Sequence, residues 1–148
     1  MSWTYQAREI DNHAAGVLID ERFRTLSPVR ELPHLAWFCV YCRHAPGDGF
    51  WHPDETASLD SIEQDLMHLC GQFGRGWAVY VMRIDTRGIR EYYFYCGEAA
   101  TLDLALPSLR KAFPTYRIEF EETTDAAWSR YKTFLPDSSP RDADVHSV

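Results

Sequence analysis

The segment 35–43 limits the possible folds more than any other part of the chain, because both of its alternating sets of side chains are apolar. Successive residues of a strand point to opposite faces of the sheet. One set consists of Leu35, Trp37, Cys39 and Tyr41, and the other of Ala36, Phe38, Val40 and Cys42. A strand that is apolar on both faces is typical of a sheet interior, so we predict that it lies at the centre of a sheet.

Patterns of apolar side chains predict five more elements after this strand. Apolar residues recur at steps of three and four over residues 56–73, which is typical of one face of a helix. An antiparallel hairpin, a second helix and a half-buried strand follow, at residues 76–85 with 89–96, 102–113 and 116–121. Pro107 either kinks the second helix or marks a late start, because proline lacks the backbone donor that a helix interior uses.

The two ends of the chain add further elements. Alternation over residues 3–9 and 16–24, with a turn region between Asn12 and Gly16, predicts an N-terminal hairpin. Residues 125–135 predict a short terminal helix, which Asp125 or Thr124 caps. The segment 136–148 is polar and contains proline, so we expect a flexible tail.

From residue 35 onward, the predicted elements follow the order strand, helix, strand, strand, helix, strand. Right-handed crossovers then give a ferredoxin-like β-α-β-β-α-β sandwich with strand order four-one-three-two. The predicted fold class is therefore α+β, with the N-terminal hairpin added at a sheet edge and a short C-terminal helix packed on the outside. We place a single domain at residues 1–135 and the tail at 136–148.

Composition and charge restrict the class of protein. Of the 148 residues, 45% are hydrophobic and 14% aromatic, which is typical of a single globular core. The formal net charge of −7 disfavours binding to nucleic acid or anionic membranes and favours a basic protein partner. The N-terminal residues do not form a signal pattern, and no apolar run reaches the roughly 20 residues of a membrane helix. We therefore expect a cytoplasmic location.

Three motifs resemble those of an uncharacterised bacterial domain-of-unknown-function family. They are Arg-Glu-Tyr-Tyr-Phe-Tyr at 90–95, Phe-Pro-Thr-Tyr at 113–116, and Trp-Ser-Arg-Tyr followed by Phe-Leu-Pro over 128–136. Members of that family resemble, and are sometimes fused to, the domain of the protein inhibitor called regulator of ribonuclease activity B. The resemblance implies a binding or regulatory role, and it supplies no catalytic residues.

The cysteines give no strong indication of chemistry. Cys39 and Cys42 have the spacing of zinc knuckles and thiol redox sites, but on a strand residues three apart point to opposite faces. No second cysteine pair completes a set of four ligands. We therefore predict neither a metal site nor a cofactor, and no catalytic residues. The alternative is a small thiol-dependent or metal-dependent enzyme, with Cys42 or Cys70 acting beside His44 or His52.

Two segments are candidate contact sites for another protein. Phe50 and Trp51 lie in a glycine-rich loop, where they either form an exposed aromatic anchor or fold back over the core. Glu119, Glu121 and Glu122 give the last predicted strand an acidic surface that suits a basic partner.

An RNA-binding surface is the main alternative to a protein-binding one. RNA-recognition domains place stacking aromatics on a sheet, where Tyr93 and Tyr95 would stand, with Arg87 and Arg90 near the phosphates. The acidic net charge and the missing glycine pattern disfavour it. The leading hypothesis is therefore a non-enzymatic protein-binding or regulatory module, of the kind found among inhibitors and immunity proteins.

Overall fold

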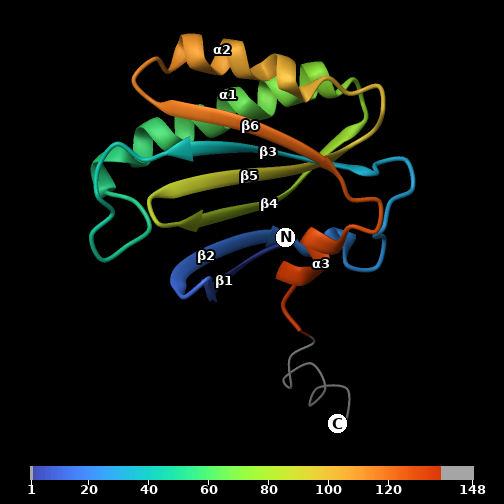
Figure 1. Ribbon diagram of the computed structural model, residues 1–148, viewed down its shortest axis with the longest axis horizontal. Coiled ribbons are helices and arrows are strands. Elements are labelled where there is room, and N and C mark those ends of the chain that lie inside the picture. Colours follow the sequence, from blue (N-terminus) through green and yellow to red (C-terminus); the bar gives the residue numbers. More distant parts are fainter. Residues whose placement is uncertain (1, 138–148) are drawn as a thin grey trace.

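Six strands form one sheet in the computed structural model, which describes residues 2–137 (Figure 1). Their order across the sheet is β1-β2-β4-β5-β3-β6, and all neighbours are antiparallel. The strands are β1 (Trp3–Ile10), β2 (His13–Asp20), β3 (His34–Tyr41), β4 (Ala78–Thr86), β5 (Ile89–Cys96) and β6 (Arg117–Thr124). The helices are α1 (Thr56–Gly74), α2 (Ala105–Ala112) and α3 (Ser129–Phe134). The predicted α+β class is confirmed.

The first two helices connect the strands in the predicted order. The helix α1 joins β3 to β4, and α2 joins β5 to β6. The hairpin β1-β2 extends the sheet beyond β4, as expected. Because β3 pairs with β5 on one side and β6 on the other along its whole length, it is an interior strand, although it is second from one edge.

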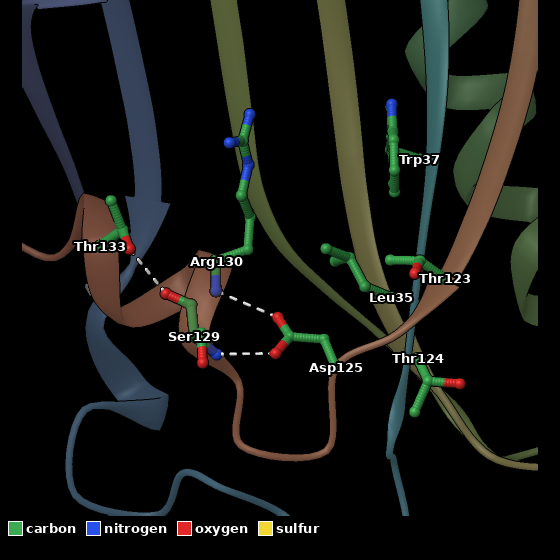
Figure 2. A pocket seen from close by; sticks show the side chains of 8 residues that line it. All are labelled: Leu35, Trp37, Thr123, Thr124, Asp125, Ser129, Arg130 and Thr133. Carbon is green, nitrogen blue, oxygen red and sulfur yellow. Dashed lines mark hydrogen bonds between the residues drawn. The ribbon is translucent and has the colours of Figure 1, made fainter.

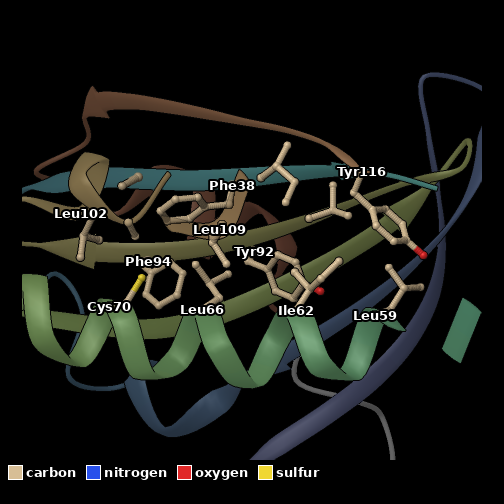
Figure 3. Close-up of a cluster of buried hydrophobic side chains, with 14 of the residues drawn as sticks. Phe38, Leu59, Ile62, Leu66, Cys70, Tyr92, Phe94, Leu102, Leu109 and Tyr116 are labelled. Carbon is tan, nitrogen blue, oxygen red and sulfur yellow. The ribbon is translucent and has the colours of Figure 1, made fainter. Parts of the chain in front are cut away.

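Two clusters of buried side chains lie on opposite faces of the sheet. On the first face, which we call the helix face, α1 and α2 cover the even-numbered residues of β3 and β5 (Figure 3). The second face, which we call the α3 face, is covered in part by α3 and by the segment after β2. Its cluster includes Val17, Phe23, Leu35, Tyr95, Trp128 and Tyr131. Segment 35–43 is therefore apolar on both faces because each face of β3 packs into a separate hydrophobic cluster.

The N-terminal hairpin differs from its prediction at the turn. Asp11 and Asn12 form the turn with φ of 51° and 67°, so β2 begins at His13 and ends at Asp20. Asparagine and aspartate tolerate this left-handed conformation, and two such residues match the twist of a hairpin. The predicted strand 16–24 is therefore wrong at both ends. Gly16 lies inside β2, where a Cβ would stand only 2.9 Å from the ring of Phe50.

The last two helices are shorter than predicted. Pro107 marks a late start, since α2 begins at Ala105 after a 3-10 turn over Leu102–Leu104. The helix α3 covers only Ser129–Phe134, because Trp128 has a left-handed backbone with φ of 58°. The carboxylate of Asp125 accepts hydrogen bonds from the first two backbone N–H groups of α3, which confirms its capping role. Of the predicted tail, residues 138–148 lie outside the described residues.

A buried carboxylate ties the loop after β3 to the strand-helix layer. Glu55 is 1% exposed and accepts hydrogen bonds from the backbone of Arg43 (2.8 Å), the backbone of His44 (3.0 Å) and the hydroxyl of Tyr116 (2.9 Å). Burial alone would raise the pKa of Glu55, but these hydrogen bonds outweigh it and hold the pKa below its ordinary value.

The variant Glu55→Gln is expected to lose stability at neutral pH, by about 1.5–3 kcal/mol, because hydrogen bonds to a charged acceptor are replaced by weaker ones. A lowered folded-state pKa gives stability that is present above the unfolded pKa of about 4.3 and lost as pH falls through the folded value. The free-energy difference between wild type and variant should therefore shrink in acid. Urea unfolding at neutral pH and at about pH 3 measures it. A difference that is independent of pH would contradict the assignment.

Candidate functional site

The helix α3 covers only part of its sheet face. It is fixed to the hairpin, since Gln6 and Arg8 of β1 donate hydrogen bonds to the carbonyls of Phe134 and Thr133. In Figure 1, α3 lies beside β2 and β4 and away from β6. Trp37 of β3 is therefore only partly buried, and Glu121 and Thr123 of β6 are exposed. This leaves the Trp37 ring of β3 partly accessible, and the α3 face of β6 exposed at Glu121 and Thr123.

A groove of about 470 Å³ separates α3 from these two strands. Figure 2 shows Trp37 and Leu35 extending from β3 toward it, Thr123 entering from β6, and Arg130 and Ser129 standing on α3 opposite them. We call this cavity the α3 groove. Its lining consists of Leu35, Trp37, Thr123, Thr124, Asp125, Ser129, Arg130 and Thr133. It therefore combines one aromatic ring, one cation and several hydroxyl groups.

Asp125 holds the end of the α3 groove in place. Besides capping α3, it accepts a hydrogen bond of 2.7 Å from the hydroxyl of Tyr95. Burial would raise the pKa of Asp125, but the bonds from Tyr95 and from the backbone of Arg130 and Ser129 lower it. The carboxylate is thus committed to positioning α3, and it is poorly suited to accept a proton.

A chain of contacts forms the floor of the surface beside the groove. Trp37 stacks on Tyr93 with ring centroids 5.6 Å apart. The hydroxyl of Tyr93 accepts from the Arg130 guanidinium (3.1 Å) and donates to a carboxylate oxygen of Glu91 (3.0 Å). These contacts link α3, β5 and β3, so they hold the aromatic ring and both charges in fixed relative positions.

Three carboxylates lie on the same face around Cys39. The strand register places Glu91 of β5 and Glu119 of β6 on either side of Cys39, and Glu121 beside Trp37. We call Glu91, Glu119 and Glu121 the acidic row. Burial and these carboxylates raise the pKa of the Cys39 thiol to about 12.

The predicted acidic surface is divided between the two faces. Glu119 and Glu121 lie on the α3 face, and Glu119 also pairs with Arg117 at 2.8 Å. Glu122 points the other way, with Phe120, which packs on Phe38 of the helix face. Glu91 of β5 was not among the predicted acidic residues, and it is the third carboxylate on the α3 face. Its position beside Cys39 follows from the pairing of β5 with β3.

The loop aromatics lie on the opposite side of the sheet from the acidic row. The ring of Phe50 packs over Gly16 of β2 on the helix face. The ring of Trp51 lies 4.5 Å from the guanidinium of Arg90, and its N–H donates to the Thr56 hydroxyl at 3.0 Å. Both side chains are partly buried, so the loop folds back over the sheet and presents only part of each ring.

The aromatic residues of the RNA alternative are not available for stacking. Tyr93 and Tyr95 are buried beneath α3, and the ring of Trp128 stacks on Tyr95 at 3.9 Å and 7°. Arg90 is buried on the helix face, and only Arg87 is exposed. Because Tyr93 and Tyr95 lie beneath α3 and Arg90 is buried on the other face of the sheet, these four residues do not form one surface.

Three of the four cysteines are buried and Cys42 is partly buried. All four thiols are free, and Cys39 and Cys42 pack on opposite faces, as predicted. The cavity beside Cys70, between α1 and β4, contains no histidine. Over residues 2–137, no group of three or more histidine, cysteine, aspartate or glutamate side chains is arranged to hold a metal ion.

Folded-state alkylation at neutral pH is expected to be slow at every cysteine. Burial raises the pKa of Cys42, the least buried thiol, to about 11, which leaves about a hundredfold less reactive thiolate than a thiol with an ordinary pKa of 9.0 would have. Intact mass spectrometry after iodoacetamide treatment, with and without urea, measures the rates. A thiol that reacts as fast in the folded protein as in urea would support the thiol-enzyme alternative.

The geometry defines an α+β protein with a half-covered sheet, an acidic row and an adjoining groove. A family model described as "Family of unknown function (DUF695)" matches residues 1–136, and the chain belongs to this family. No curated protein and no solved structure matches the chain significantly. Within residues 2–137, none of the helices has the length and apolarity needed to cross a membrane.

Proposed function

We propose that the protein is a non-enzymatic protein-binding module whose contact surface is the uncovered part of the α3 face. This surface comprises Trp37, the acidic row and the α3 groove. The observation that carries the proposal is the partly buried Trp37 ring, which is held by Tyr93 beside a groove and flanked by carboxylates from two strands. An aromatic centre with a charged rim is typical of protein interfaces.

Charge and chemistry both support this proposal. The net charge of −7 and the acidic row favour a basic partner, which long-range attraction would bring to the surface. The raised pKa of the Cys39 thiol and the structural role of Asp125 make both groups poorly suited to act as nucleophile or base. The resemblance to domains of a ribonuclease-regulating inhibitor agrees with a role in regulation.

Affinity capture from native lysate tests the proposal. Immobilised wild type is compared with Glu119→Lys/Glu121→Lys and with Asp65→Lys/Asp103→Lys, which changes the net charge equally at exposed sites on the other side of the molecule. We expect a protein that the wild type and the control capture and that the acidic-row variant loses. If the same proteins bind to all three, the contact surface is not the one proposed.

We also infer that β3 to β6 form a ferredoxin-like unit to which the hairpin has been added. Counted from β3, the order β4-β5-β3-β6 reads two-three-one-four, which is the ferredoxin-like order viewed from the other edge. Similar units use the sheet face opposite their helices for binding. In this chain α3 closes half of that face, which confines binding to the side of β6.

A further inference from the structure

We propose that the partner of this surface is an extended basic segment that adds to the outer edge of β6 as a further strand. The inference rests on the proposed function and specifies how the partner binds. Strand addition supplies main-chain hydrogen bonds, and alternate side chains of the segment then contact the two faces of the sheet. Three features of β6 support it: its free edge, its charge and the side chains beside it.

The outer edge of β6 is suited to pairing. All eight residues of Arg117–Thr124 pair with β3 without a register shift, and the strand contains no proline. Among the described residues, no strand lies on its other side, because β6 ends the sheet. The Arg110 side chain donates to the carbonyl of Ile118 near the start of the strand. The following residues therefore offer the longest stretch for an incoming strand.

The charge of β6 selects the occupant. Glu121 and Glu122 are exposed and Glu119 is partly exposed. If a second copy paired through its own β6, glutamates would stand opposite glutamates, which destabilises a strand pair and disfavours self-association. Lysine or arginine side chains would instead be neutralised at these positions. A basic segment from another protein is thus the occupant that fits, and a second copy is not.

The two faces of β6 specify an alternating pattern in that segment. On the α3 face, basic side chains would lie next to Glu119 and Glu121. On the helix face, Phe120 is partly exposed at the rim of the first core, where its ring lies 4.9 Å from that of Phe38. An apolar side chain placed beside Phe120 would extend this core. The expected ligand therefore presents basic residues to the α3 face and an apolar residue beside Phe120, so basic and apolar residues alternate over Glu119–Glu121.

A labelled peptide, acetyl-Lys-Val-Lys-Ile-Lys-Val-Lys-amide, provides the probe, and fluorescence anisotropy at low salt measures its Kd. We expect binding to weaken by roughly tenfold or more in Glu119→Lys/Glu121→Lys and to stay unchanged in Asp65→Lys/Asp103→Lys. Peptides N-methylated at alternate residues, in each of the two phases, keep the charge and lose backbone donors. One phase should lose binding and the other should retain it. Amide exchange of the full-length protein should slow in β6 when the unmodified peptide binds.

The outcomes separate this inference from the proposed function. Equal binding of both N-methylated peptides and the unmodified one, or unchanged amide exchange in β6, overturns strand addition. If a lysate protein is still captured through the acidic row in that case, the proposed function stands without it. Equal peptide binding by both charge variants also overturns the inference. Circular dichroism of each variant confirms that the fold is retained before binding is compared.

Discussion

The variant Trp128→Ala is expected to lose about 3–5 kcal/mol of unfolding free energy, which is the range for removing a buried tryptophan. The Trp128 side chain is 0% exposed and stacks on Tyr95, with Phe23 and Tyr131 packed against it. Its indole N–H donates to the carbonyl of Leu32 at 2.9 Å, and the variant leaves that buried acceptor without its donor. The loss thus combines a cavity with an unsatisfied polar group.

The matched control is Trp77→Ala, which removes the same side chain from a surface site. Trp77 is 46% exposed and belongs to neither buried cluster, so the variant should change stability by about 1 kcal/mol or less. Urea unfolding of the three proteins measures both effects. Equal losses of unfolding free energy in the two variants would mean that Trp128 contributes little to the buried cluster on the α3 face. Trp128→Ala should also lose the partner, because the α3 groove needs α3 as one wall.

The variant Arg90→Met is expected to have an effect of similar size, about 3–5 kcal/mol, because it breaks the shorter ion pair of the buried Asp85 carboxylate and leaves only Arg83, at 3.3 Å, beside it. Arg90 is 2% exposed and its Nε donates to Asp85 at 2.7 Å. Its guanidinium also lies over the ring of Trp51, 4.5 Å from the ring centroid. The β3–α1 loop should therefore loosen together with the loss of stability.

A second variant distinguishes the lost charge pair from lost packing. Adding Asp85→Asn to Arg90→Met removes the buried carboxylate that has lost Arg90 and retains only Arg83, so the double variant should recover part of the loss. Lys111→Met, at an exposed site on α2, is the control and should stay within about 0.5 kcal/mol of wild type. The single variant Asp85→Asn is measured as well. If the stability loss of the double variant equals the sum of the losses in Arg90→Met and Asp85→Asn, the pair is not coupled as the structure indicates.

Local patterns predicted most of the fold. The steps of three and four over 56–73 gave α1 to within one residue, and the two-sided apolarity of 35–43 gave an interior strand. The error at β2 arose because glycine signals a turn in most contexts, whereas Gly16 makes room for the Phe50 ring. That contact joins residues far apart in the sequence, so no local pattern records it.

The candidate site was predicted only in part, for a related reason. The alternation of β6 placed Glu119 and Glu121 on one face, but their neighbour Glu91 depends on the register between β5, β3 and β6. Trp37 was hidden in an apolar strand, and its partial exposure follows from how far α3 extends over the sheet. The length of α3 in turn depends on the left-handed backbone of Trp128, which burial in the second core stabilises.

Site-specific photo-cross-linking in cells shows whether another protein binds at the surface beside β6. A benzophenone amino acid replaces Glu121 in one protein and Asp103, at an exposed site on the far side, in the other. We expect a discrete covalent adduct with another protein at position 121 and none at position 103. Adducts at position 103 alone, or the same adducts at both positions, would contradict a protein-binding surface beside β6.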